Sequence, residues 1–402
     1  MSLEQSNRSF ATFLLVLLAV ISSRTILAQE DKEVQAVLQA NDKFTENLYS
    51  ILARKPGNVF FSPISVHAIL SLAYQGAKGK TLEAFTKALN LPDGRVAATG
   101  YKDIMTRLNS VENVTLRIAD KLFLQESFKL QQSFKIVAVN QFLSEVELLN
   151  FKEPAPAAAS INSWVEKETN HKIKDLVNPA DINDDTTLIL VNAIYFKGKW
   201  AESFDVKNTK TEKFYLNDDD TQVLLQERPE ALDAQVLELP YANRDISLIV
   251  VLPNKRDGIE ELEKNLAKID LARITDDMYK AKVKVALPKF KIEQTIDLMS
   301  PLTELGLGVM FSPDADLSGI IETPDPLHVS KIIQKAFIEV NEEGAEAAAA
   351  TETGISTTAQ VDDSTTSLKT VLVDHPFDIF LVQQVGPLVE VLFAGRVNLP
   401  EE

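Results

Sequence analysis

The chain of 402 residues contains no cysteine and only four histidines. Without cysteine no disulfide can hold the fold together, so stability must come from the packing of a large core. The histidines are scattered, and no G-x-S-x-G, H-E-x-x-H or cysteine-rich metal sequence is present. These absences disfavour a catalytic or metal-binding role for His67, His171, His328 and His375, although a serine and a histidine brought together in space would escape such motifs.

Long hydrophobic runs are also scarce. The run Phe10–Ile21 is broken only by Thr12, but it is too short to span a bilayer, for which about 20 apolar residues are needed. Preceded by Arg8 and followed by small Ala28, it indicates a signal peptide over residues 1–28. We therefore expect a secreted, extracellular protein with no membrane anchor.

Basic residues are in deficit, with 41 Lys and Arg against 58 Asp and Glu and a formal net charge of −17. So acidic a chain is an unlikely partner for nucleic acid. Four lysines, Lys282, Lys284, Lys289 and Lys291, suggest a polyanion site, but their even spacing fits the exposed face of a half-buried strand, which we favour.

What the chain does contain is an ordinary globular composition, 45% hydrophobic and 25% charged. That is enough apolar material for a sizeable core. No internal repeat or low-complexity linker divides it, so residues 29–402 are predicted to form one domain of α+β class. The sequon Asn113-Val114-Thr115 predicts a surface glycan at Asn113.

Helices are predicted where apolar residues recur at steps of three and four. Ser62 is a good N-cap and Pro63 suits the first helical position, so a helix should run over 64–74. The run Gly76–Thr81 ends like a phosphate-binding loop, but Tyr74 stands where its first glycine should be, so a turn between helices is the better interpretation. Further helices are expected over 34–52, 81–89, 97–108, 154–169 and 258–269.

Strands are predicted around one buried centre. Thr186–Phe196 is almost entirely apolar and rich in β-branched and aromatic residues, as in a strand covered on both faces. The C-terminus is typical of a hairpin, with strands at Phe377–Val385 and Leu388–Val397 around Gly386-Pro387. Other strands are expected over 116–124, 213–216, 236–239, 247–252 and 281–291.

The stretch Lys335–Ala359 admits two interpretations. Its Ala and Glu content predicts an exposed helix or linker over Glu342–Glu352. Read with a period of two, it instead has Glu346 and Glu352 on one face and an uncharged opposite face. That uncharged face consists of Ala345, Ala347, Ala349, Thr351, Thr353 and Ile355. With small side chains and no proline, such a segment could enter between two strands without burying a charge.

Six stretches resemble motifs of the serpin family, in the family's order. They are NVFFSPISVHAILSLAYQGAKGKT at Asn58–Thr81, TTLILVNAIYFKGKW at Thr186–Trp200, LELPYANRDISLIVVLPN at Leu237–Asn254, LPKFKIE at Leu287–Glu293, EVNEEGAEAAAAT at Glu339–Thr351, and DHPFDIF with VLFAGRVNLP within Asp374–Pro400. The resemblance covers about Val34 to Pro400, and the residues of the stretch Glu339–Thr351 are similar to those of arthropod members. It implies three β-sheets, eight or nine helices, and an exposed reactive-centre loop over about residues 344–373.

The resemblance also implies a mechanism. In the family, a serine protease attacks the loop and forms an acyl-enzyme, and the cut loop then inserts as a new central strand of the main sheet. About twelve inserted residues at about 3.3 Å each carry the tethered protease roughly 40 Å before it can deacylate. The native inhibitor is accordingly metastable and protected by a kinetic barrier. No cofactor is implied, and the inhibitor is expected to be a monomer before it forms a complex.

By the same resemblance, two groups of residues support insertion. The hinge comprises Glu342, which pairs in the family with a lysine, here Lys289, together with Gly344, Ala345, Ala347, Ala348, Ala349 and Ala350. The gate and insertion-point support comprises Ser62, Ser65, Asn192, Gln334, Lys289 and Trp200. Gln334 stands where histidine is frequent in the family. Because an amide does not titrate, we expect a gate without pH sensitivity.

Family spacing from Gly344 places the attacked bond at Thr358–Ala359. Small residues there favour an elastase-like protease, with chymotrypsin-like or trypsin-like enzymes as alternatives. Leu368 and Lys369 are a second candidate region, but cleavage so far from the hinge should leave a slack tether and give substrate behaviour. The resemblance therefore implies a suicide inhibitor rather than an enzyme. A non-inhibitory carrier, storage or binding serpin is the alternative, disfavoured because the hinge lacks charged, bulky or proline residues on its small-residue run.

Overall fold

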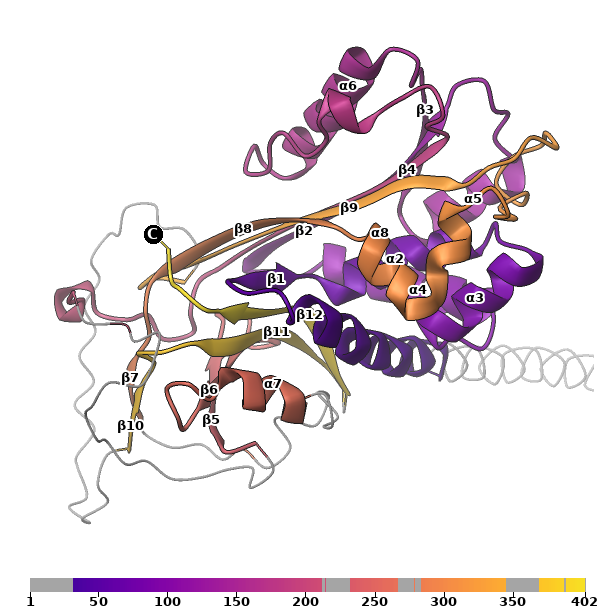
Figure 1. Cartoon of the computed structure of the whole chain (residues 1–402). Coiled ribbons are helices and arrows are strands. Elements are labelled where there is room, and N and C mark those ends of the chain that lie inside the picture. The colour runs from indigo at the N-terminus through magenta and orange to yellow at the C-terminus, as the bar shows by residue number, and fades with distance from the viewer. Residues whose placement is uncertain are drawn as a thin grey trace, which may run out of the picture.

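Three β-sheets and eight α-helices make up the described part of the chain in this computed structural model (Figure 1). The structure describes residues 32–401 apart from 212–213, 215–231, 267–277, 279–282, 345–368 and 387. The mixed helix and strand content confirms the predicted α+β class and the three sheets.

The main sheet contains five strands in the order β3-β2-β4-β9-β8. Its strands are β3 Glu145–Leu149, β2 Val114–Gln125, β4 Leu188–Gly198, β9 Val329–Val340 and β8 Phe290–Asp297. β4 is the middle strand and is buried along almost its whole length, as its apolar sequence predicts. It runs antiparallel to β2 but parallel to β9, and this parallel pair becomes important below.

The second sheet has the order β1-β12-β11-β6-β5. Its strands are β1 Val59–Phe61, β12 Leu388–Val397, β11 Phe377–Val385, β6 Ile246–Pro253 and β5 Ala234–Pro240. The predicted C-terminal hairpin is confirmed to the residue, and Gly386 adopts φ 59° in its turn. Such a left-handed backbone is readily available to glycine.

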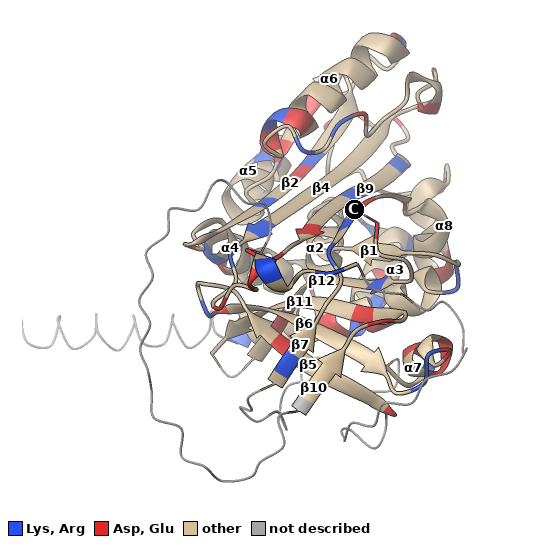
Figure 2. Cartoon of the chain, turned by 90° about the vertical axis from the view of Figure 1, so that its left-hand side faces the viewer, with Lys and Arg blue, Asp and Glu red and all other residues tan. Residues whose placement is uncertain are grey.

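Helices cover both faces of the main sheet. α2 Pro63–Tyr74 is buried at every position and contacts both β4 and β12, so it lies between the two large sheets. On the opposite face, α6 Pro154–Glu168 lies along the main sheet (Figure 1). The remaining helices are residues 32–52, α3 Gly79–Leu89, α4 Gly94–Asn109, α5 Gln132–Gln141, α7 Ile259–Leu266 and α8 Met299–Leu302. Acidic and basic residues are mixed along α6 and α7 (Figure 2).

The predicted single strand over 281–291 is wrong. The chain forms β7 Val283–Ala286 and β8 in two different sheets, separated by Leu287-Pro288-Lys289. Proline has no backbone N–H to donate to a ladder, which explains the break between the strands. Lys284, Lys289 and Lys291 are exposed, as expected for solvated positions, whereas Lys282 lies outside the described residues.

β7 pairs in parallel with β10 Lys369–Leu372 to form the small third sheet. This strand begins where the predicted reactive-centre loop was expected to continue to residue 373. Lys369 is paired with Val283, so a protease could reach the bond after Lys369 only if β10 first left β7. The geometry thus opposes the second candidate cleavage region, while Leu368 itself lies outside the described residues.

Candidate functional site

The candidate site is the seam between the parallel strands β4 and β9. Their register runs from Leu188–Val329 to Tyr195–Phe337. Beyond that point β9 continues to Val340 and then enters a turn formed by Asn341–Gly344. The Asn341 side chain stabilises this turn, because its Oδ1 accepts hydrogen bonds from the backbone N–H groups of Glu343 and Gly344, each at 3.1 Å.

Gly344 ends the described hinge in a position only glycine can hold. Its φ is 126°, and a Cβ atom there would lie 2.1 Å from the carbonyl oxygen of Gly198. It forms antiparallel bridges to Lys199, just past β4, and to Asn341, just past β9. The chain leaving β9 therefore turns back between the ends of the two strands, in the direction antiparallel to both.

Trp200 fastens this turn to the end of β4. Its indole Nε1 donates to the carbonyl oxygen of Asn341 at 2.9 Å, and its backbone N–H donates to the carbonyl oxygen of Glu343 at 3.0 Å. The ring stacks on Tyr241 with 4.4 Å between centroids and 20° between planes. Trp200 is 4% exposed, so it is a core residue and a hinge contact at once.

Glu342 joins the hinge to the chain before β8. Its carboxylate lies 3.7 Å from Lys289 Nζ and accepts a hydrogen bond of 2.7 Å from Thr209 Oγ1. The bond from Thr209, with the lysine charge as a smaller cause, lowers the pKa of Glu342. Because Lys289 is 40% exposed, this ion pair orients the hinge more than it stabilises the fold.

A polar cluster lies beneath the middle of the seam, where Asn192 and Gln334 are opposite each other on β4 and β9. Gln334 accepts from the backbone N–H of Ser62 and donates to its carbonyl oxygen, both at 3.0 Å, and it also donates to Asn192 Oδ1. Asn192 in turn donates to Ser65 Oγ. Ser62, Ser65, Asn192 and Gln334 are all buried, so parting the strands must break these hydrogen bonds.

Ser62 contributes to the gate through its backbone and not, as the sequence predicts, by capping α2 with its side chain. It stands at the N-cap position of α2, but its hydroxyl makes no capping hydrogen bond and has no partner. Its backbone, held by Gln334, makes the contacts instead, because a glutamine amide matches a peptide N–H and C=O at the same time.

Asp120 on β2 belongs to the same cluster and was not predicted from the sequence. Its Oδ1 accepts a hydrogen bond from Asn192 Nδ2. Burial raises the pKa of Asp120 to about 7, against the opposing effect of hydrogen bonds from Asn192 and Ser65. Although Gln334 does not titrate, the gate therefore contains a group that does. The antiparallel register of β2 and β4 places Asp120 opposite Asn192, and no motif in the sequence marks that pairing.

Comparison with known proteins agrees with this geometry. The model of the family described as "Serpin (serine protease inhibitor)" matches residues 39–400. The chain belongs to the serpin family. It is 35% identical to alaserpin of Manduca sexta, over 96% of this chain and all of that protein. It is 36% identical to antichymotrypsin-2 of Bombyx mori, over 85% and 93% of the two chains.

The fold of this serpin is likewise that of known family members. The crystal structure of Serpin48 from the insect Tenebrio molitor superposes with a TM-score of 0.80 and 34% identity, covering 91% of this chain and 99% of that one. The family description and the name antichymotrypsin-2 both refer to inhibition of proteases. The chain is therefore grouped with protease inhibitors and not with enzymes.

In this serpin α6 lies over the outer face of the main sheet, where it contacts β2 (Figure 1). Ala157, Ile161 and Val165 of that helix belong to one apolar cluster with residues of β2, β4 and β9. Trp164 meets the ring of Phe123 edge-on, with centroids 5.7 Å apart. α6 therefore lies on the same face of the sheet as the outer side of the seam.

Two of the four histidines are buried and form structural hydrogen bonds. His67 is buried between Tyr101 and the carbonyl oxygen of Leu89, and burial lowers its pKa to about 4. His375 binds Asp374 and the carbonyl oxygen of Pro253. Within the described residues, no cluster of three or more metal-ligating side chains occurs, and no helix is long and apolar enough to cross a membrane.

Several predicted residues lie outside the described part of the chain. These are the signal segment 1–28, the hinge residues Ala345, Ala347, Ala348, Ala349 and Ala350, and the bond Thr358–Ala359. The predicted glycan acceptor Asn113 is described, and it is exposed just before β2.

Proposed function

We propose that this serpin is a secreted suicide inhibitor of serine proteases, which traps the acyl-enzyme by inserting its cleaved loop between β4 and β9. The observation that carries the proposal is the position of Gly344, which already bridges to the ends of both strands in the antiparallel direction. Continuing that direction takes residue 345 onward down the seam.

Insertion should stabilise the sheet for a general reason. It would replace one parallel pair, β4 with β9, by two antiparallel pairs, and antiparallel ladders are slightly more stable for each residue. The face of the loop that would turn toward α2 and the core carries no charge if Ala345 and every second residue point inward. Glu346 and Glu352 would then lie on the α6 side.

The proposed target is a serine protease with a small, elastase-like specificity pocket, because small residues flank Thr358–Ala359. Attack on this bond leaves Thr358 acylated to the protease serine and frees the chain from Ala359 onward. Fourteen residues, 345–358, then connect the protease to the hinge, which is enough for insertion along the full seam.

The test is incubation with elastase-like, chymotrypsin-like and trypsin-like proteases, followed by denaturing gel electrophoresis. An inhibitor of this kind gives a covalent band at the summed mass of the two proteins. Mass spectrometry of the released C-terminal peptide should show Ala359 as its first residue. If every protease cuts the loop and none remains attached, the protein is a non-inhibitory serpin. A peptide beginning at another residue would move the attacked bond without removing the mechanism.

Secretion and glycosylation form a separate part of the proposal. Expression of the full chain in insect cells should deliver to the medium a monomer that begins at Gln29 and carries glycan on Asn113. Terminal sequencing, peptide mass mapping and size-exclusion chromatography check these three points. Retention of an intact N-terminus inside the cell would reject the signal-peptide assignment.

A further inference from the structure

The carboxyl group of Asp120 ends the chain of hydrogen bonds in the gate cluster beneath the seam. Gln334 donates to Asn192 Oδ1, and Asn192 Nδ2 donates in turn to Asp120 Oδ1 and to Ser65 Oγ. The other N–H bond of the Gln334 amide is directed to the carbonyl oxygen of Ser62, at 3.0 Å. Both amides therefore use all their donors, and the chain from Gln334 through Asn192 leads to the carboxyl group.

Asp120 has no cation to balance a negative charge. Within the described part of the chain, no side chain forms an ion pair with it. The next residue, Lys121, lies on the opposite face of β2, where its Nζ is 2.9 Å from Glu145 and 2.7 Å from Glu147 of β3. The same ammonium group lies 5.1 Å from the centre of the Trp164 ring of α6. An ionised Asp120 is thus an uncompensated charge in the closed cluster, which is unfavourable.

The other titratable groups packed around Asp120 stay neutral between pH 5 and pH 8. Tyr101 of α4 is close enough to be affected by its charge, but burial raises the pKa of this hydroxyl well above its usual value. His67 of α2 is hydrogen-bonded to Tyr101, and burial lowers its pKa to about 4. Asn192 of β4 and Ser144, just before β3, also contact Asp120 and do not titrate. Burial raises the pKa of Asp120 itself to about 7, so this carboxyl group changes charge in that range.

Opening the seam changes the surroundings of this carboxyl group. Parting β4 from β9 breaks the hydrogen bond between Asn192 and Gln334 and admits water beside Asn192 and Asp120. Water stabilises an ionised carboxylate far more than a protonated one. The pKa of Asp120 should therefore fall from about 7 in the closed sheet toward its ordinary value of 3.8 in the open one. By linkage, release of the proton favours the open seam and uptake favours the closed seam.

We propose that a proton on Asp120 holds the seam shut, and that release of this proton lets β4 and β9 part. Asp120 is then a positioning residue for loop insertion, acting through Asn192. The inference rests on the proposed inhibitory mechanism, because the open seam is where the cleaved loop is proposed to enter. It opposes the expectation, based on Gln334, of a gate that does not respond to pH. The serpin is held closed in mildly acidic surroundings and becomes ready for insertion near neutral pH.

The test is hydrogen exchange of the uncut, full-length protein between pH 5 and pH 8, followed by mass spectrometry and corrected for the intrinsic effect of pH on amide exchange. Amides of β4 and β9 should exchange faster than those of β6 and β11, which shows that the seam opens locally and not by global unfolding. Their protection should fall about tenfold from pH 5 to pH 7 and level off above pH 7. No protease takes part, so this result is independent of whether trapping succeeds.

Two outcomes in the parent protein overturn the proposal. One is protection of β4 and β9 that does not change with pH or rises with it. The other is exchange at equal rates in β4, β9, β6 and β11, because the seam then has no opening of its own.

Variants of Asp120 assign the titrating group. Asp120→Asn keeps an oxygen that accepts from Asn192 but carries no charge, so β4 and β9 should show the low-pH protection of the parent at every pH. Asp120→Ser, a smaller acceptor that does not titrate, gives the same measurement if the asparagine variant does not fold. PH dependence as steep as that of the parent in either folded variant rejects the assignment.

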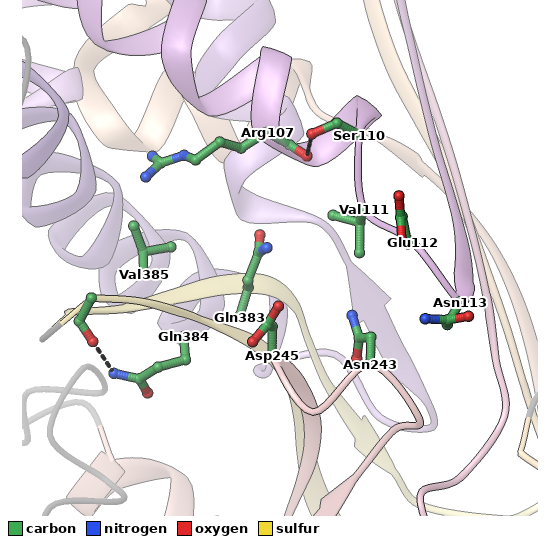
Figure 3. A pocket seen from close by; sticks show the side chains of 11 residues that line it. Arg107, Ser110, Val111, Glu112, Asn113, Asn243, Asp245, Gln383, Gln384 and Val385 are labelled. Atoms are coloured by element: carbon green, nitrogen blue, oxygen red, sulfur yellow. Dashed lines mark hydrogen bonds between the residues drawn. The ribbon is translucent and has the colours of Figure 1, made fainter.

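Glu390→Gln is the matched control, because it removes the other carboxyl group whose pKa burial raises to about 7. Glu390 is 1% exposed on β12, is paired with Gln383 of β11 and attracts Arg107 of α4. Gln383 and Arg107 line a cavity between the end of α4 and the second sheet, and no gate residue lines it (Figure 3). The pH dependence of exchange in β4 and β9 should persist in this variant. Its loss would transfer the effect to Glu390 and overturn the proposal.

Discussion

At the scale of single residues, Gly344 is the position where backbone geometry leaves the least choice. Gly344→Ala would combine a φ of 126° with a Cβ placed 2.1 Å from a backbone oxygen that cannot rotate away. A backbone strained in this way typically costs about 1–3 kcal/mol, and the clash adds to that. We expect a lower thermal midpoint and slower trapping of protease, because the turn that directs the loop into the seam is disturbed.

The matched control for this prediction is Gly57→Ala. Gly57 also has a positive φ, 90°, but a Cβ there would have no atom within 4 Å. It therefore reports backbone strain without the clash and without the hinge. Calorimetry and trapping rates compare the two variants. Equal losses in both measurements would mean that the contact of Gly344 with the end of β4 has no special importance.

Asp120 makes the stability of the gate depend on pH. Burial raises the pKa of this carboxyl from 3.8 to about 7 in the folded protein, so the folded state binds its proton more tightly than the unfolded state does. Between about pH 4 and pH 7 the folded state thus holds more protons, and the free energy of unfolding must fall as pH rises through this window. The stabilised state is the one with Asp120 protonated.

Asp120→Asn should flatten part of this dependence, since an amide offers similar hydrogen bonds without titrating. The measurement is the urea midpoint at several values between pH 5 and pH 8. Glu390, whose pKa burial also raises to about 7, should contribute a remaining slope of the same sign. A variant whose midpoints change with pH as steeply as those of the parent would show that Asp120 stays ionised throughout.

At the scale of elements, the seam and the loop must fit as strand to strand. Ala345→Arg would bring a charge to the face proposed to turn inward, and burying an unpaired charge is strongly unfavourable. Insertion should become slower than deacylation of the acyl-enzyme, so the variant should be cut and released as a substrate. Glu346→Arg introduces the same side chain at the next position, on the face proposed to point away from the core. It should remain an inhibitor.

The measurement is the ratio of serpin cleaved to protease trapped, read from denaturing gels. Position, and not the charge of arginine, should decide the outcome. If both variants become substrates, or if both still trap, the assigned alternation of the loop is wrong.

Helices and strands whose local sequence pattern matches their burial in the fold could be predicted from the sequence. β4 is a continuous run of apolar, β-branched and aromatic residues, α2 is marked by Ser62 and Pro63 at its start, and the hairpin β11–β12 is marked by its Gly386-Pro387 turn, so local sequence identifies all three. The break between β7 and β8 was missed because both segments alternate in the same way, and only Pro288 and the pairing partners separate them. β9, an interior strand of the main sheet, could not be assigned as a strand because its mixed sequence has no single polar face.

The residues of the candidate site likewise divide into those that the sequence identifies and those that only the structure shows. Ser65, Asn192 and Gln334 could be found by family resemblance, and the structure brings them together. Asp120 could not be found that way, because its neighbours in space come from β4 and α2, far from it in sequence. The part played by the Ser62 backbone is equally a matter of three-dimensional contact, since its side chain suggested a cap that does not form.

At the scale of the whole molecule, the closed seam stores the driving force of the proposed mechanism. β4 and β9 are held together by their parallel ladder, by the gate cluster beneath and by the apolar cluster that their outer faces form with β2 and α6. Each of these contacts must be released before a new strand enters. The uncut protein is therefore expected to be trapped behind a barrier and not to lie at its free-energy minimum.

Cutting the loop without capture should release this energy. A protease that is not a target, such as a cysteine protease cleaving within residues 345–368, leaves the hinge free to insert. About twelve new backbone hydrogen bonds at roughly 1 kcal/mol each would add on the order of 10 kcal/mol. At about 2 °C for each kcal/mol, the thermal midpoint should rise by about 20 °C or more. Calorimetry of intact and cleaved protein gives this difference directly.

Ala345→Arg, cleaved in the same way, is the control, and its thermal midpoint should rise much less because its inward face carries a charge. A cleaved parent that melts no higher than the intact protein would show that the loop does not enter the seam, whatever the gels reveal about protease binding.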